Sequence, residues 1–234
     1  MFFKIRKELL ELVEADYKEF SASLIPGVER FLGIRLPKLR ELAKRIQKED
    51  KELYLSQYWE EVGKQQEGLY FEEDMICGML TASGRMPLEE RKEAISRFLP
   101  RIQNWSVCDS CCVTCKFMKK NQDFWYDFLK EQLASGEEFM IRFALVNLLD
   151  HFVNEEYVGQ VLVACENMKH PGYYAKMAAA WAVSVCFAKF PGQTKEFLKE
   201  NTMDDWVQNK SIQKIRESYR ASKEDKEKIL EYKR

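Results

Sequence analysis

The chain has 234 residues, of which 46% are hydrophobic and 32% are charged, a balance typical of a folded globular protein. Only 10 glycines and 6 prolines are present, too few for the many tight turns of a β-sandwich or barrel. Helix-favouring residues dominate, which predicts an all-α protein. The net charge of −1 excludes a strongly basic coat, so a polyanionic partner would have to meet a local basic patch.

The first residues, Met1 to Glu8, become amphipathic at once, which argues against a signal peptide. The longest uncharged apolar run, Met177 to Ala188, is too short to cross a bilayer, so we expect no membrane partner. Seven cysteines, an odd number in clustered positions, indicate free thiols in a reducing compartment. We therefore predict a cytoplasmic protein.

Apolar residues recur at helical spacing along most of the chain. We expect one helix over 2–19, a break at Ile25-Pro26-Gly27, and a helix from Pro37 to about Lys48. Further helices are predicted over 51–62, 68–82, 87–99, 105–119, 123–133, 137–150, 155–168, from 171 onward, and over 192–200, 208–220 and 223–232.

About twelve helices joined by short turns, with no linker between them, predict a single domain over residues 1–234. Helix pairs recur at about 30–40 residues, a period typical of degenerate HEAT-like repeats. Such repeats stack into a curved α-solenoid with a concave groove. A generic helical bundle is the alternative, although twelve short helices exceed what one bundle usually holds.

The segment 105–119 carries an unusual row of side chains. Read as one helix, it places Trp105, Asp109, Cys112 and Lys116 one turn apart on a single side. A carboxylate within an apolar, sulfur-rich run is rare in a purely structural helix. The structural alternative is a salt-bridged Asp109 at a surface edge and a core Trp105.

Four cysteines at 108, 111, 112 and 115 have the appearance of a metal site, but they share one face of the predicted helix. Four thiols spread over two helical turns do not converge on one tetrahedral centre, so we predict core packing rather than metal binding. His151 and His170 are too few for a multi-histidine site. No phosphate loop or nucleophile elbow is present, and we predict neither a metal nor a cofactor.

Basic residues gather in three regions, near 35–45, 116–120 and 210–220, where successive inner helices of a solenoid could follow a phosphate backbone. Solvated helix faces are the alternative for at least half of them. Arg142 is rarer, because its neighbours are apolar and a buried arginine requires an acceptor, either a carboxylate or a phosphate. Trp181 lies in an alanine-rich helix, where core packing is the usual outcome.

Several motifs together resemble the DNA alkylation repair family, the HEAT-like-repeat alkylpurine DNA glycosylases of the AlkD type. The resemblance covers nearly the whole chain. It is carried by Phe31-Leu32-Gly33-Ile34-Arg35-x-Pro37-x-x-Arg40, Asn104-Trp105-x-x-x-Asp109, Arg142, Ala180-Trp181 and Asn209-Lys210-x-Ile212-x-Lys214. The chain departs from many relatives at Asn104 and Ser106, and residues 23–27 lack an aromatic residue that some members use.

The resemblance implies that Asp109 is the catalytic carboxylate and that Trp105 and Trp181 are aromatic residues of the cleft. It also implies that Arg142 braces the DNA backbone, that no cofactor is needed, and that the partner is duplex DNA with alkylated bases. We expect a monomer associated with a bacterial-type nucleoid. The other candidate DNA contacts are Arg35, Lys38, Arg40, Lys116, Lys176, Lys210 and Lys214.

The residue types suit this chemistry. A purine alkylated at N3 or N7 is cationic, and indole rings attract cations. A nearby carboxylate stabilises the oxocarbenium character that develops on the sugar. Two alternatives stay open: a non-catalytic HEAT-like module that binds DNA of unusual structure, and a protein–protein scaffold without salt-dependent DNA affinity.

Overall fold

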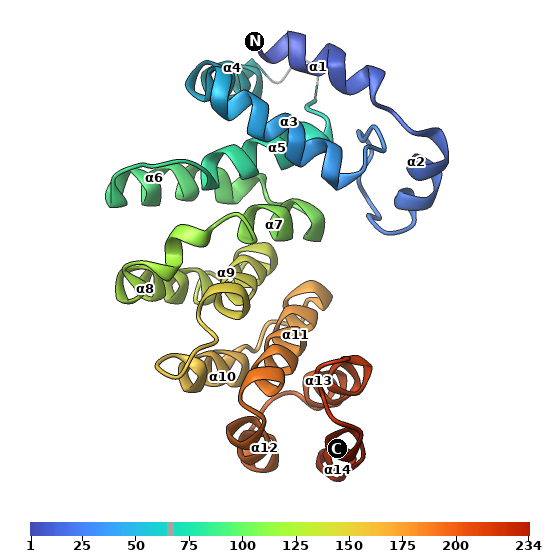
Figure 1. Cartoon of the computed structure of the whole chain (residues 1–234), viewed down its shortest axis with the longest axis vertical. Coiled ribbons are helices and arrows are strands. Elements are labelled where there is room, and N and C mark those ends of the chain that lie inside the picture. Colours follow the sequence, from blue (N-terminus) through green and yellow to red (C-terminus); the bar gives the residue numbers. More distant parts are fainter. Residues whose placement is uncertain (65–67) are drawn as a thin grey trace. The chain divides into compact units, whose positions relative to one another are not determined.

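The computed structural model describes residues 1–64 and 68–234, and every regular element in these ranges is helical (Figure 1). The prediction of an all-α protein is therefore confirmed. None of the described helices is both long and apolar enough to cross a membrane. The chain folds as two compact units, residues 1–115 and 116–234, called here the N-terminal and C-terminal units. The single domain and the HEAT-like solenoid remain predictions.

The N-terminal unit centres on α5, whose residues are almost all buried and which packs against α3, α6 and α7. Gly78 allows the close approach, because a Cβ there would lie 2.7 Å from the Phe98 ring. The helices of this unit are α1 (Phe2–Glu11), α2 (Ala15–Ala22), α3 (Leu36–Glu49), α4 (Lys51–Lys64), α5 (Phe71–Ala82), α6 (Leu88–Phe98) and α7 (Trp105–Cys112), with a 3-10 turn, η1, over Leu99–Arg101.

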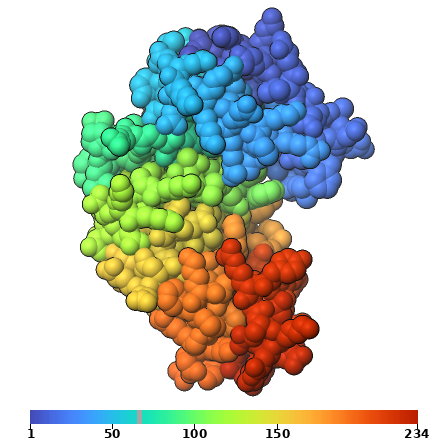
Figure 2. All heavy atoms as spheres, viewed as in Figure 1, coloured from blue at the N-terminus to red at the C-terminus, as the bar shows by residue number. Residues whose placement is uncertain are grey.

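The C-terminal unit centres on α11, which packs against α9, α10, α12 and α13. Its buried alanines, Ala178 to Ala180 and Ala182, keep its surface narrow enough for neighbours on several sides. In the space-filling view, α13 and the last residues (red) lie alongside α11 and α12 (orange) (Figure 2). The elements are η2 (Lys116–Lys119), α8 (Gln122–Leu133), α9 (Glu138–His151), α10 (Val158–Asn167), α11 (Tyr173–Lys189), α12 (Pro191–Glu200), α13 (Asp205–Glu217), α14 (Lys223–Lys228) and η3 (Ile229–Tyr232).

The predicted helix over 2–19 is wrong in one respect, because the chain breaks it into α1 and α2. Glu14 adopts an extended conformation before α2, and its N–H donates to the carbonyl of Gly33 at 3.3 Å. A tertiary hydrogen bond thus replaces the bond that a continuous helix would have made. Periodicity alone carries no information on such a partner.

The predicted helix over 105–119 is also too long. α7 ends at Cys112, and the Thr114 hydroxyl donates to the Ser110 carbonyl at 2.9 Å, a local bond that competes with helix continuation. The β-branched pair Val113-Thr114 is itself a weak helix former. Lys116 therefore begins η2 and does not share the helical row of Trp105, Asp109 and Cys112.

Candidate functional site

The predicted pair of Trp105 and Asp109 lies on α7, which begins at Trp105 because Asn104 caps it. The Asn104 side-chain oxygen accepts hydrogen bonds from the N–H groups of Ser106 at 2.9 Å and Val107 at 3.0 Å. Asparagine is among the strongest N-cap residues. Its presence before Trp105, a departure from many relatives, thus has a local structural reason: it fixes where the helix carrying both residues starts.

Trp105 and Asp109 are both half-buried and lie one turn apart on the same side of α7. The Trp105 indole N–H donates to the carbonyl of Leu24 at 2.8 Å, which ties the ring to the loop before Ile25-Pro26-Gly27. A tryptophan whose polar edge is satisfied by main chain has a restricted orientation. The loop 23–27 supplies no aromatic ring, but it does hold one in place.

The four cysteines of the 108–115 segment are fully buried. The Cys108 and Cys112 sulfurs lie 3.9 Å apart, and the Cys115 thiol donates to the Cys111 carbonyl at 3.4 Å. Burial raises the thiol pKa of Cys112, and the contact with Cys115 together with burial raises that of Cys111. Core packing, as predicted, is their observed environment. Within residues 1–64 and 68–234 no three potential metal ligands form a group.

Two of the predicted DNA contacts in the N-terminal unit share one carboxylate. Glu14 receives the Arg35 Nε at 2.9 Å and the Lys38 Nζ at 3.0 Å, and the two cations hold the pKa of this carboxyl below its usual range. The Arg35 guanidinium also lies 4.6 Å from the centre of the Tyr17 ring. Arg40 is exposed on α3. Both paired cations are thus partly neutralised before any phosphate arrives.

The loop that precedes Arg35 is anchored by Glu72, a residue that the sequence reasoning missed. Its buried carboxylate accepts N–H bonds from Leu32 at 2.9 Å and Gly33 at 2.8 Å, and burial raises its pKa. Gly33 has φ +85°, and a Cβ there would collide with Lys18. The motif Phe31 to Arg40 is therefore held in shape by a residue of α5.

Glu73 and Asp74, the next residues of α5, bind two further elements. Glu73 pairs with Arg6 of α1 at 2.7 Å, and Asp74 pairs with Arg101 of η1 at 2.9 Å. Burial raises the pKa of Asp74 despite its cationic partner. Three adjacent carboxylates at the start of an apolar helix are the signal that could have revealed this structural role from the sequence.

In the C-terminal unit, Trp181 is half-buried and borders an open groove of about 610 Å³. Trp181 and Lys214 are the two predicted site residues that the structure brings together there. Asp150 adds a carboxylate that the sequence analysis did not select. The groove is lined by Leu149, Asp150, Trp181, Ser184, Val185, Ala188, Lys189, Lys214, Glu217, Ser218 and Arg220.

Burial lowers the pKa of Lys214, and the nearby charges of Lys210 and Arg142 lower it further, against the opposing effect of Glu217. Partial desolvation and nearby cations both destabilise the charged form of a lysine. A bound phosphate would stabilise that charged form. Lys214 is therefore suited to the predicted phosphate contact.

Arg142 is almost fully buried on α9, and its Nη1 donates to the main-chain carbonyl of Tyr174 at 3.0 Å. One turn earlier, Glu138 accepts the N–H of Tyr174 at 2.5 Å. The two α9 side chains therefore hold both polar groups of one residue in the first turn of α11. Gly172 permits this approach, since a Cβ there would collide with Glu138. Arg142 thus has a structural role, and its contact with DNA remains a prediction.

The remaining predicted contacts lie at the surface of the C-terminal unit. Lys176 pairs with Asp204 at 3.2 Å, and Lys210 donates to Gln213 at 2.8 Å. Lys116 is exposed in η2. The candidate residues thus divide between the units, with Asp109 in the first and Trp181 in the second. Their convergence on one cleft remains a prediction.

Comparison with known protein families decides the assignment. A family model described as DNA alkylation repair enzyme matches residues 5–215. The chain belongs to this family. The family predicted from the motifs is thereby confirmed, and the match includes Trp105, Asp109, Arg142 and Trp181. A search among curated proteins found no match.

Proposed function

We propose that this member of the DNA alkylation repair family is a DNA glycosylase that hydrolyses the N-glycosidic bond of cationic alkylated purines in duplex DNA. Its substrates are of the 3-methyladenine and 7-methylguanine type. The observation that carries the proposal is the half-buried Trp105–Asp109 pair on α7, with the indole N–H fixed by Leu24. DNA as the partner follows from the family. We further propose that the helices stack as HEAT-like repeats and that the protein acts as a monomer.

The proposed reaction breaks the bond between the sugar C1′ and the purine nitrogen. The bond electrons move to the alkylated base, which leaves neutral because it began as a cation. The sugar gains oxocarbenium character, and a carboxylate beside it lowers the energy of that state. Water then adds to C1′ and gives up a proton. The residues invoked here act without a metal or organic cofactor.

In this proposal Trp105 and Trp181 contact the cationic base through their ring faces, while Asp109 faces the sugar. Indole–cation attraction contributes about 0.5–2 kcal/mol per contact. Neutral lesions gain none of this attraction, so the rings select for charge. The cations Arg35, Lys38, Arg40, Lys116, Arg142, Lys176, Lys210 and Lys214 are the proposed backbone contacts.

The test is release of free base from a duplex that contains one N7-methylguanine, compared with duplexes that contain uracil or 8-oxoguanine. We expect release of methylguanine only. Asp109→Asn removes the charge with little change in shape, and we expect at least about a 100-fold slower release. Asp150→Asn is the matched control, because it neutralises a carboxylate in the Trp181 groove.

Asp150→Asn should release base at a rate within about threefold of wild type. A change of that size is expected from the loss of one nearby charge when the residue has no role in the chemistry. Equal release by wild type and Asp109→Asn would show that the catalytic assignment is wrong. Binding to bulged or branched DNA without any base release would favour the non-catalytic module instead. Thermal unfolding of each variant separates loss of chemistry from loss of fold.

A further inference from the structure

A second surface of the C-terminal unit combines aromatic rings with cations. We call it the Trp206 hollow, a depression of about 290 Å³ on α13. None of the side chains that line it is acidic, and the nearby Glu217 accepts a hydrogen bond from Gln213 at 2.7 Å. It is lined by Trp206, Asn209, Lys210, Gln213, Arg216 and Lys233.

Two aromatic side chains at this surface are exposed to solvent. Trp206 is 38% exposed and Tyr173, at the start of α11, is 56% exposed. Their ring centres lie 5.9 Å apart, edge to face, and the Lys210 ammonium lies 5.7 Å from the centre of the Trp206 ring. Exposed large aromatic surface next to cations is the composition of sites that stack nucleobases.

The cations of the hollow lack carboxylate partners. Within the described part of the chain, no ion pair involves Lys210, Arg216 or Lys233, whereas Arg35 and Lys38 both pair with Glu14. Lys210 donates only to the neutral side chain of Gln213. Three cations without an ion-pair partner form a surface that is complementary to a phosphate backbone.

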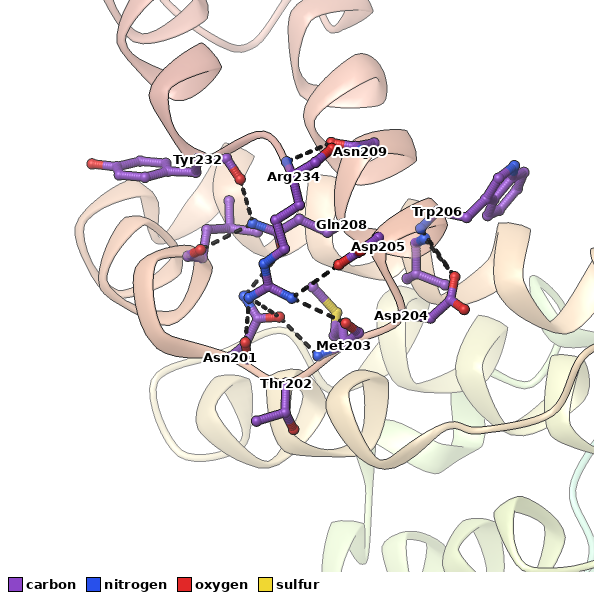
Figure 3. A network of polar contacts seen from close by, with 12 residues as sticks. Asn201, Thr202, Met203, Asp204, Asp205, Trp206, Gln208, Asn209, Tyr232 and Arg234 are labelled. Carbon is purple, nitrogen blue, oxygen red and sulfur yellow. Dashed lines mark hydrogen bonds and ion pairs between the residues drawn. The ribbon is translucent and has the colours of Figure 1, made fainter.

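The two carboxylates next to Trp206 in sequence are engaged elsewhere. Asp204 caps α13 by accepting the Trp206 N–H at 3.0 Å and pairs with Lys176. Asp205 lies 3.8 Å from Arg234. Figure 3 shows the Trp206 side chain directed away from this network of polar contacts. The ring is therefore available to a ligand. Asp204 is held by the protein, and Asp205, whose side chain is 73% exposed, lies beside Arg234.

The same network fixes the last residues beside α13. Arg234 and Asn209 exchange two hydrogen bonds, at 2.6 and 3.1 Å, and the Arg234 guanidinium donates to the Met203 carbonyl at 3.0 Å (Figure 3). These bonds place Lys233, the preceding residue, at the edge of the hollow. The basic surface is thus assembled from two segments and held in place by a structural arginine.

We propose that the Trp206 hollow binds single-stranded DNA, with one base stacked on the Trp206 ring and with Lys210, Arg216 and Lys233 on the adjacent phosphates. This inference rests on the proposed function only in taking DNA as the partner. Binding at the Trp206 hollow does not require base release. Helix α13 also carries Lys214 in the Trp181 groove, close enough to Lys210 for their charges to interact. Because Lys210 and Lys214 lie one turn apart on α13, one strand can contact both lysines.

The test is fluorescence anisotropy of a labelled dT12 oligonucleotide with the full chain. We expect Trp206→Ala to weaken binding by about 5- to 150-fold, the range for losing one base–aromatic stack, while Trp206→Phe stays within about threefold of wild type. Lys233→Gln should lower the slope of log affinity against log salt by about 0.7.

The matched control is Trp59→Ala. Trp59 is half-buried and, like Trp206, lies beside a cation, with Arg97 at 4.1 Å, but its surroundings include Glu52 and Glu60. It should bind dT12 as wild type does. The inference is overturned if Trp206→Ala binds within twofold of wild type, if Trp59→Ala loses as much, or if rU12 or polyglutamate binds tenfold better than dT12.

The two proposals fail separately. If wild type releases no alkylated base but binds dT12 through Trp206, the glycosylase proposal falls and the binding surface stands. If base release depends on Asp109 but Trp206→Ala does not change dT12 binding, the glycosylase proposal stands and the proposed binding surface is wrong. Unfolding temperatures of the Trp206 variants, expected to match wild type because the side chain is at the surface, confirm that binding is the property changed.

Discussion

Two groups of basic residues, one in each unit of this protein, differ in whether carboxylates pair with them. In the N-terminal unit, the carboxylates of α5 are buried and bound by other elements, and the cations Arg35 and Lys38 are paired with Glu14. In the C-terminal unit, Lys210, Arg216 and Lys233 form a surface without carboxylate partners among the described residues. Arg35 and Lys38 are therefore bound within the protein, whereas Lys210, Arg216 and Lys233 are available to a ligand.

This difference shows why a count of lysines and arginines is a poor guide to an anion-binding surface. The net charge of −1 argues mildly against a nucleic-acid partner. Whether a given cation can bind phosphate depends on its partner. A cation paired with a carboxylate must give up that partner to bind a phosphate, whereas an unpaired cation need not. Substitutions that change this pairing test whether it controls DNA affinity.

The largest effect is expected from Glu72→Ala, which removes the buried carboxylate that anchors Leu32 and Gly33. Two buried N–H groups would lose their acceptor, at a cost of about 3 kcal/mol in the free energy of unfolding. Urea denaturation followed by circular dichroism measures it. The control is Glu52→Gln, a side chain 76% exposed, which should change stability by less than about 0.5 kcal/mol. Equal effects of the two substitutions would refute the anchoring role.

A smaller effect is expected from Glu14→Gln, which removes the charge that Arg35 and Lys38 share. Both cations then become available to phosphate, and affinity for duplex DNA should rise by about two- to tenfold at low salt. Glu41→Gln, on the exposed side of α3, also removes one negative charge and controls for the effect of the protein's overall charge on DNA affinity. A loss of affinity in Glu14→Gln would mean that the carboxylate orients the two cations for DNA.

The smallest effect concerns pH. Because burial lowers the pKa of Lys214, its charge is lost at a lower pH than that of an ordinary lysine, while a bound phosphate favours the charged form. DNA affinity should therefore begin to fall at a pH below the ordinary lysine pKa of about 10.4 as pH rises, because Lys214 loses its charge earlier than an ordinary lysine does. Lys214→Gln should remove this dependence. Arg220→Gln, in the same groove, should keep it because arginine does not titrate.

The sequence contained enough to predict the family, the all-α class and the helix near Pro37, which the structure places at Leu36–Glu49. These features depend on local composition, periodicity and motif order. The pair of Trp105 and Asp109 on one side of α7 was likewise readable, because both fall within one helix. Composition, periodicity and motif order predict features that depend on residues close together in the sequence.

The errors and omissions have the opposite origin. The break at Glu14 depends on Gly33, the role of Glu72 depends on Leu32, and the Arg142 bond depends on the main chain of Tyr174. Each involves a partner many residues away, and one sequence without relatives does not reveal such pairs. The early end of α7 is the exception, because the low helix propensity of Val113 and Thr114 could be recognised from the sequence.

In the proposed reaction, Asp109 of the N-terminal unit stabilises the transition state and Lys214 of the C-terminal unit contributes to DNA binding. Single-turnover release of N7-methylguanine at increasing protein concentration measures both quantities in one experiment. We predict that Asp109→Asn lowers the rate at saturation by about 100-fold or more with half-saturation within about threefold of wild type. Lys214→Gln should raise the half-saturating concentration about threefold or more and leave the saturated rate unchanged. If the saturated rate is unchanged in Asp109→Asn, or falls sharply in Lys214→Gln, these roles of the two residues are wrong.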